Sequence, residues 1–228
     1  MQYRIQIERE KAVFAFLTFL QKKENFQRGA LLHLLTCICR NNPEVALFLL
    51  KYSTEEPLKE LIFHALRLYP VPGAGSSILQ NIHRDTSITT LSAAVEALEH
   101  YPEINGISHL TPLVVHKHWQ VRASVAKSLG VCGNQEGIEL LGRLACDYSY
   151  RVRRNAVESL KKLSETSDTL VESILADPDH PSYGLTREII GGVPATKSET
   201  PPAGSRPSSF PYGKTDISPV IARAYGVV

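Results

Sequence analysis

The side chains best placed for chemistry are a histidine and a cysteine in the first part of the chain. His33 and Cys37 lie four residues apart, a spacing that puts an imidazole and a thiol on one face of a helix, where both could bind a transition metal. Two ligands do not complete a metal site, and a histidine packed beside a buried thiol is far more common. We therefore expect no metal, no cofactor and no catalytic residue.

A run of basic residues offers a second chemistry, the binding of phosphate groups. Nine basic residues crowd one part of the chain: Lys117, His118, Arg122, Lys127, Arg151, Arg153, Arg154, Lys161 and Lys162. Such a stripe could hold a nucleic-acid backbone or a phosphorylated ligand. The whole chain, however, has 25 Lys and Arg against 23 Asp and Glu, a net charge of +2 that is far below that of a typical nucleic-acid-binding domain. Nucleic-acid or phosphate binding is thus an alternative and not the main interpretation.

The elements that carry these residues recur along the chain. Five leucines occur at spacings of 32, 32, 31 and 31 residues: Leu34, Leu66, Leu98, Leu129 and Leu160. Eight, four and three positions before each leucine the residue is apolar, with Thr90 the exception, and these offsets share one face of a helix. A fixed period of this size is typical of stacked helical repeats.

Shorter apolar segments between the leucine-bearing helices predict one further helix in each repeat. They are Pro43–Tyr52, Ser76–Arg84, Ile104–His116, Gly137–Cys146 and Thr169–Ala176. An additional amphipathic helix near Arg4–Gln21 is expected to cap the N-terminal end, because a terminal repeat would otherwise expose an apolar face. The sequence therefore predicts an all-α fold, an α/α solenoid of about five helical hairpins that forms one domain over residues 1–176.

Two of these helices resemble a known repeat. Residues 121–130 resemble the second helix of a HEAT repeat, in the short form found in phycobilisome-lyase-type proteins. Residues 147–160 resemble it more fully, with an aspartate in the turn and a Val-Arg pair five and six residues later. In that family the aspartate and the arginine hydrogen-bond between neighbouring repeats, so the resemblance implies an inter-repeat role for Asp147, Arg122 and Arg153. One repeat earlier, His116 stands where the aspartate would be.

The resemblance also brings enzymes into view. Some HEAT-like proteins are hydroxylases with paired His-Glu metal motifs, some remove alkylated bases from DNA, and some attach bilin chromophores. None of the eight histidines precedes a glutamate, which excludes the hydroxylase motif, and a single tryptophan without a nearby aromatic cluster argues against base removal. A bilin-lyase-like enzyme stays an open alternative, because no short motif carries its pocket.

The composition changes after residue 176. Eight of the 14 prolines lie between Pro178 and Pro219, and residues 193–209 are rich in Pro, Ser, Thr and Gly, so we expect 177–228 to be a flexible tether. Residues 217–228 turn apolar again. We expect this end to dock on the repeats or on another protein. The residues expected to make that contact are Ile217, Val220, Ile221 and Tyr225.

Cysteine usage and hydropathy bear on location. The four cysteines include no CxxC pair, which favours a reducing compartment, and the longest apolar stretch, 12–20, is far shorter than the ~20 residues of a membrane span. The chain shows no signal-peptide organisation. We expect a cytoplasmic protein without a membrane span.

These observations predict a non-catalytic scaffold or adaptor whose partner is another protein, free or within a larger or membrane-associated assembly. Long, shallow surfaces of stacked repeats bind by shape and polar complementarity. We expect the leucine-bearing helices, which are the second helices of the HEAT-type pairs, to present that surface. The residues expected to bind the partner there are Lys127, Arg151, Arg154 and Glu158.

Overall fold

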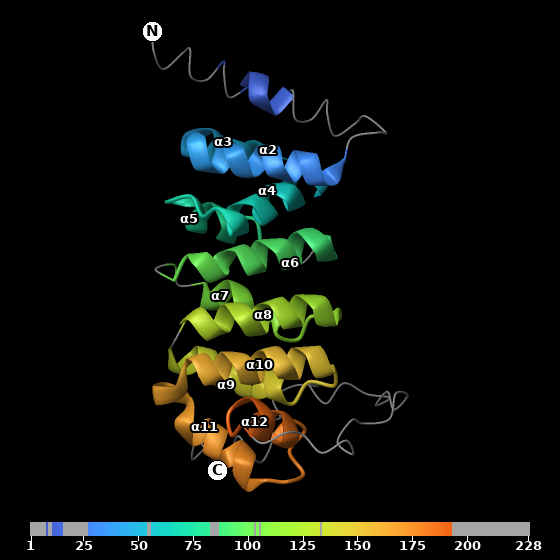
Figure 1. Cartoon of the computed structure of the whole chain (residues 1–228), viewed down its shortest axis with the longest axis vertical. Coiled ribbons are helices and arrows are strands. Elements are labelled where there is room, and N and C mark those ends of the chain that lie inside the picture. Colours follow the sequence, from blue (N-terminus) through green and yellow to red (C-terminus); the bar gives the residue numbers. More distant parts are fainter. Residues whose placement is uncertain are drawn as a thin grey trace. The chain divides into compact units, whose positions relative to one another are not determined.

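Every regular element that the structure describes is helical, as the sequence predicted (Figure 1). The computed structural model describes residues 8, 11–15, 27–53, 56–82, 87–102, 104, 106–132 and 134–192. The contacts divide the chain into two compact units, residues 1–109 and 110–228. The division falls at α7 (Ile107–Leu110), a single helical turn followed by the 3-10 turn η2 (Thr111–Leu113). Such short elements offer little helix surface for packing.

The first unit alternates long and short helices. The long ones are α2 (Arg28–Asn41), α4 (Glu56–Leu68) and α6 (Ile88–Ala97), which ends in the 3-10 turn η1 (Leu98–His100). The short ones are α3 (Pro43–Tyr52) and α5 (Ala74–Leu79). Helix α4 packs against both α2 and α6, and α3 packs against α5. The bounds of α3 are those predicted, because Pro43 suits the first turn of a helix, where the missing N–H costs nothing.

The second unit repeats the arrangement. Its helices are α8 (Trp119–Cys132), α9 (Gln135–Ala145), α10 (Tyr150–Lys162), α11 (Ser164–Ala176) and α12 (Tyr183–Ile189). Helix α10 packs against α8 on one side and α12 on the other, while α9 contacts α11. Asn134 caps α9 by accepting a hydrogen bond from the Gly137 N–H at 2.9 Å. Each unit therefore has a layer of leucine-bearing helices and a second layer formed by the helices between them.

The predicted register places the core correctly in four of the five repeats. Leu66, Leu98, Leu129 and Leu160 are buried, and so are all residues eight, four and three positions before them. The first copy differs, since Ala30 is exposed, Leu34 is only half-buried and Phe26 lies outside the described residues. Helix α2 buries Leu31, Leu35 and Cys39 instead. Among the described residues α2 packs mainly against α3 and α4, whereas α4 lies between two long helices, so the buried stripe of α2 is narrower.

The structure describes the C-terminal end of the expected domain more fully than the N-terminal end. Helix α12 lies beyond residue 176 and packs against α10 and α11, so the packed part extends into the segment expected to be a tether. This helix was not predicted from the sequence, because it is short and lies between Pro178-Asp179-His180-Pro181 and Gly191-Gly192. At the other end, residues 11–15 of the expected capping helix are helical. The rest of that helix, and the tail from residue 193, lie outside the described residues.

Candidate interaction site

A buried ion pair joins the start of α8 to the turn before α10. Arg122 Nε donates to Asp147 Oδ2 at 2.5 Å, and Arg122 Nη2 donates to Asp147 Oδ1 at 3.0 Å. The side chain of Arg122 is 2 % exposed and that of Asp147 6 %. Burial disfavours the charge of Arg122, but its hydrogen bonds with Asp147 outweigh this, so the pKa of the guanidinium is raised. Two of the three residues expected to link repeats therefore meet.

Both partners of this pair also hold the backbone of their own turns. Arg122 Nη1 donates to the carbonyl oxygens of His116 at 2.6 Å and Lys117 at 3.3 Å. Asp147 Oδ1 accepts a hydrogen bond from the Ser149 N–H at 2.7 Å, just before α10 begins. Because charged groups make the stronger hydrogen bonds, the pair fixes two successive turns and the helices that follow them.

Arg153, the third expected link, does not reach the Asp147 carboxylate. Its Nη1 donates to the carbonyl oxygens of Asp147 at 2.8 Å and Tyr148 at 3.1 Å, which repeats the backbone contacts of Arg122 one repeat later. Its Nε is buried and has no hydrogen-bond partner. Burial lowers the pKa of Arg153, and the charge of Asp147 offsets this only in part. Arg153 therefore repeats the position of Arg122 without an acid to receive it.

A histidine occupies the position where the next acid would lie. His180 Nδ1 accepts a hydrogen bond from the Ser182 N–H at 3.0 Å, as Asp147 Oδ1 does from Ser149. In the turn before α8, one repeat before Asp147, His116 Nδ1 likewise accepts a hydrogen bond from the His118 N–H at 3.3 Å. The three turns thus carry His116, Asp147 and His180 at one structural position. Sequence reasoning identified His116 as the counterpart of Asp147 but missed His180, although the Ser182 that follows it could have marked the start of another helix.

The surroundings of His180 favour its neutral form. The imidazole is buried, its Nε2 lies 3.3 Å from Cys146 Sγ, and its Nδ1 is already an acceptor, so the ring proton is on Nε2 and points to the sulfur. Burial lowers the pKa of His180, Asp177 raises it, and Arg153 lowers it again, with a net decrease. Burial also raises the pKa of the Cys146 thiol to about 11, so the sulfur carries no charge that could hold an imidazolium.

The packing of the second unit should therefore weaken in mild acid. Unfolded His180 titrates near its usual pKa of about 6.5, and the folded residue titrates lower. The unfolded chain then binds more protons between these two values, so the free energy of unfolding is complete above pH ~6.5 and falls as the pH drops through this window. Urea unfolding at a series of pH values, followed by the emission of Trp119, measures the effect.

The control for this dependence is His180→Asn, which keeps an acceptor for the Ser182 N–H but does not titrate. Burial also lowers the pKa of His116, which has the same sign of effect, so the variant should retain only a smaller acid dependence. An unchanged pH profile in His180→Asn would contradict the role given to His180.

The four residues expected to bind a partner fall into two places. Lys127 is half-buried on α8, and Arg154 and Glu158 lie on α10, where Arg154 Nε donates to Glu158 Oε1 at 2.9 Å. Lys127 and Glu158 occupy equivalent positions on these packed helices, and we call Lys127, Arg154 and Glu158 the α8–α10 face. Arg151 lies apart, at the start of α10, with its Cζ 5.4 Å from the ring centroid of Trp119.

Hydrogen bonds to the backbone hold the α8–α10 face in shape. Asn155 Nδ2 donates to the Ala123 carbonyl oxygen at 2.9 Å, and Ser159 Oγ donates to that of Ala126 at 2.8 Å. The helices are close enough that a Cβ at Gly130 would lie 3.1 Å from the Ser159 Cα and 2.5 Å from its Oγ. The absence of a side chain at Gly130 therefore permits the contact between α8 and α10.

In the first unit the corresponding helices are joined by charged side chains. Arg28 on α2 pairs with Glu60 on α4 at 2.5 Å, and Glu60 also lies 3.4 Å from His64. Arg67 on α4 pairs with Glu96 on α6. Each of these ion pairs joins an exposed arginine to a more covered glutamate on the next long helix, and solvent screens the pairs because the arginines are exposed.

Other sequence candidates add no second site among the described residues. His33 Nε2 and Cys37 Sγ lie 3.7 Å apart on the exposed side of α2. Within the described ranges no group of three or more His, Cys, Asp or Glu side chains is placed to hold a metal ion. The expected docking residues Ile217, Val220, Ile221 and Tyr225 lie outside the described residues. In the described part of the chain, no helix is both long and apolar enough to cross a bilayer.

Comparison with known proteins identifies the repeat. Residues 107–183, which include α8 to α11 with their ion pair, match the family model for HEAT repeats. No curated protein and no solved structure matches the chain. The match is to HEAT repeats as such and carries nothing of the finer resemblance to phycobilisome-lyase-type proteins. Residues 107–183 of this chain are therefore HEAT repeats.

Proposed function

We propose that this protein is a non-catalytic scaffold or adaptor that binds another protein through the α8–α10 face. HEAT repeats generally serve as protein-interaction elements. The observation that carries the proposal is the contrast between a fixed frame and exposed charges. Asn155, Ser159 and the buried Arg122–Asp147 pair hold α10 against α8, while Arg154 is exposed on the same helix. A preformed polar surface loses little conformational entropy on binding.

The pairing of charges on this face favours a protein partner over nucleic acid. On this face Arg154 is engaged by Glu158, and outside it, in the last turn of α10, Lys161 Nζ donates to the Ile189 carbonyl oxygen at 2.6 Å. Phosphate binding depends on cations whose counterions can be released, and cations that already have partners contribute less. A face that presents both signs of charge suits the mixed polar surface of another protein.

The tail supplies a second, tethered contact in this proposal. Residues 217–228 are apolar and follow a segment rich in Pro, Ser, Thr and Gly. A tethered contact raises the effective concentration of the second binding event and strengthens the whole interaction without new contacts on the repeats. The free thiols of Cys37, Cys39 and Cys146 support a cytoplasmic location, which stays part of the proposal.

Charge reversal on the α8–α10 face should weaken partner binding and leave the fold intact. Lys127→Glu with Arg154→Glu is expected to reduce recovery of the partner by about tenfold, because charged contacts at an interface turn repulsive. The measurement is crosslinked affinity capture with the full chain as bait, together with circular dichroism of each bait. A bait that ends at Gly192 measures the contribution of the tail.

The matched control is Arg40→Glu with Lys51→Glu, which makes the same change of charge on exposed residues of the first unit. Support requires a protein that the control captures and the face variant does not, with crosslinks at Lys127. Equal recovery by the face variant and the control would contradict the proposal.

A further inference from the structure

Exposed aromatic and apolar side chains gather at the turns that precede α8 and α10. The exposed large apolar residues of the described chain are Tyr52, Leu68, Tyr69, Val115, Tyr148 and Tyr150. Three of these six lie in the two turns or at the first residue of α10, with Val115 47 %, Tyr148 55 % and Tyr150 44 % exposed. Single exposed apolar residues are ordinary, but a cluster of them marks an interaction surface.

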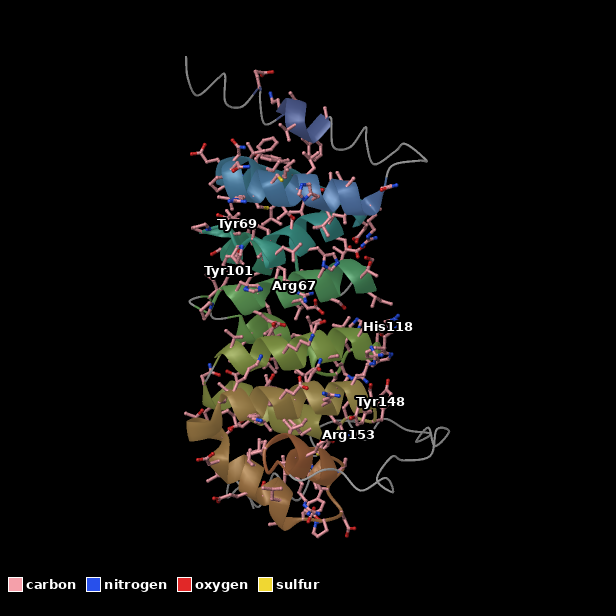
Figure 2. All side chains as sticks on the ribbon, viewed as in Figure 1. Arg67, Tyr69, Tyr101, His118, Tyr148 and Arg153 are labelled. Carbon is pink, nitrogen blue, oxygen red and sulfur yellow. The ribbon has the colours of Figure 1, made fainter. Side chains whose placement is uncertain are left out.

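The two turns form one surface because the buried ion pair joins them. Asp147 belongs to the turn before α10 and binds Arg122, which holds the turn before α8. Aromatic contacts add to this, since Arg122 Cζ lies 4.6 Å from the ring centroid of Tyr148 and Arg151 covers Trp119 from the neighbouring helix. Figure 2 shows His118 and Tyr148 at the same ends of α8 and α10. We call this surface the aromatic edge, made of Val115, Lys117, Trp119, Tyr148, Tyr150 and Arg151.

The aromatic edge is positively charged. Residues 115–122 and 147–154 contain five Lys and Arg residues and one carboxylate, Asp147. That carboxylate is buried and bound by Arg122, whereas Lys117 and Arg151 are exposed. The N-terminal ends of α8 and α10, which carry partial positive charge, lie here as well. A ligand that contacts this edge therefore meets cations and aromatic rings together.

We propose that the aromatic edge binds an acidic peptide segment of a partner protein, with an apolar side chain of that segment placed against Trp119, Tyr148 and Tyr150. Carboxylates of the peptide pair with Lys117 and Arg151. Tryptophan, tyrosine and arginine are the residues that most often carry binding energy at protein interfaces, and this edge contains all three. The surface uses residues other than those of the α8–α10 face, so it stands independently of the function proposed above.

The tail of this chain is a poor occupant for the same edge. Residues 193–228 contain Lys197, Arg206, Lys214 and Arg223 against Glu199 and Asp216, a net charge of +2. Like charges disfavour the docking of this segment on a positive edge. The occupant therefore comes from another protein that carries acidic residues.

The aromatic rings also suit a peptide better than nucleotide bases. Bases stack on open ring faces, but Arg122 already covers a face of Tyr148 and Arg151 a face of Trp119. Farther along α10, the cations that could follow a phosphate backbone are engaged, Arg154 by Glu158 and Lys161 by the Ile189 carbonyl oxygen. Apolar side chains, in contrast, can pack against ring edges and the stems of arginines.

The test uses the full chain and a set of fluorescein-labelled peptides in which glutamate alternates with phenylalanine or leucine. A matched set carries glutamine in place of every glutamate. We expect saturable binding of the acidic peptides by fluorescence anisotropy, and a change in the emission of Trp119, the single tryptophan of the chain. The affinity should fall with added salt, since the charges at the edge are exposed.

Variants of the chain then locate the binding. Lys117→Glu with Arg151→Glu should weaken acidic-peptide binding by at least about tenfold, while Lys127→Glu with Arg154→Glu should change it far less. Circular dichroism checks that both variants are folded. The proposal is overturned if no acidic peptide binds, if the glutamine peptides bind equally well, or if the edge variant binds as the unmodified chain does. Displacement of the acidic peptide by oligothymidylate at lower concentration would reassign the edge to nucleic acid and also overturn it.

Discussion

Replacing Asp147 with alanine is expected to lower the free energy of unfolding of the second unit by about 3–5 kcal/mol. The substitution leaves the guanidinium of Arg122 buried without its carboxylate, and an unpaired buried charge is one of the most costly defects in a protein interior. It also removes the acceptor for the Ser149 N–H at the start of α10. Urea unfolding, monitored by the fluorescence emission of Trp119, measures the loss, since Trp119 is the first residue of α8.

Two further variants separate charge from shape in this prediction. Asp147→Asn keeps an acceptor for Ser149 but loses the charge, and should fall between the unmodified chain and Asp147→Ala. Arg122→Met with Asp147→Leu removes both charges of the pair and should recover part of the loss, because no Arg122 guanidinium is left buried without its carboxylate. Recovery should be incomplete, since the carbonyl oxygens of His116 and Lys117 lose their donor. An Asp147→Ala protein as stable as the original would show that the pair contributes nothing to folding.

Replacing Leu129 with aspartate should unfold the second unit or reduce its stability by more than about 4 kcal/mol. Leu129 is buried on α8, next to Gly130, where α8 and α10 approach closely. The substitution removes buried methyl groups and places a carboxylate at a position shielded from solvent. Circular dichroism and Trp119 emission in a thermal melt report the loss.

A second position tests the burial argument directly. Leu34 occupies the same position of the repeat but is only half-buried, so Leu34→Asp should cost far less, about 1–2 kcal/mol. Leu129→Met, which conserves volume, should cost less than about 1.5 kcal/mol. Equal losses from Leu34→Asp and Leu129→Asp would mean that the burial of the two leucines does not determine the cost.

The long helices could be predicted from the sequence because their signal is periodic and repeated. Leu66, Leu98, Leu129 and Leu160 are buried, as the shared register predicts, because one apolar stripe on each helix meets its neighbours. The bounds of the shorter helices were predicted less accurately. The predicted helix 104–116 is in fact the single turn α7 followed by η2, since Pro112 cannot donate the hydrogen bond that would continue an α-helix.

The contents of the site were predictable only where the repeat pattern carries them. The Val-Arg and aspartate pattern pointed to Arg122, Asp147 and Arg153, and two of these form the ion pair. Nothing in a linear pattern shows that Arg153 Nε lacks a partner or that His180 lies beside Cys146. Those contacts depend on the spacing between the turn before α10 and the turn before α12. Their equivalent residues, Asp147 and His180, are 33 residues apart. The aromatic edge was not predicted from the sequence for a similar reason, because Arg151 and Trp119 meet only when successive repeats stack.

The hydrogen bonds from side chains of one repeat to the backbone of an earlier repeat bear on how an array of repeats can gain copies. Asn155 and Ser159 donate to the backbone carbonyl oxygens of Ala123 and Ala126, and Ser182 Oγ donates to that of Ala145. In these three bonds the later segment binds the main chain of an earlier one, and every amino acid provides that acceptor. The earlier helix can change its side chains without losing the bond, while the later helix must keep its donor. A duplicated copy inserted after an existing repeat would find its acceptors already present, so the array can lengthen in one direction while the older copies diverge.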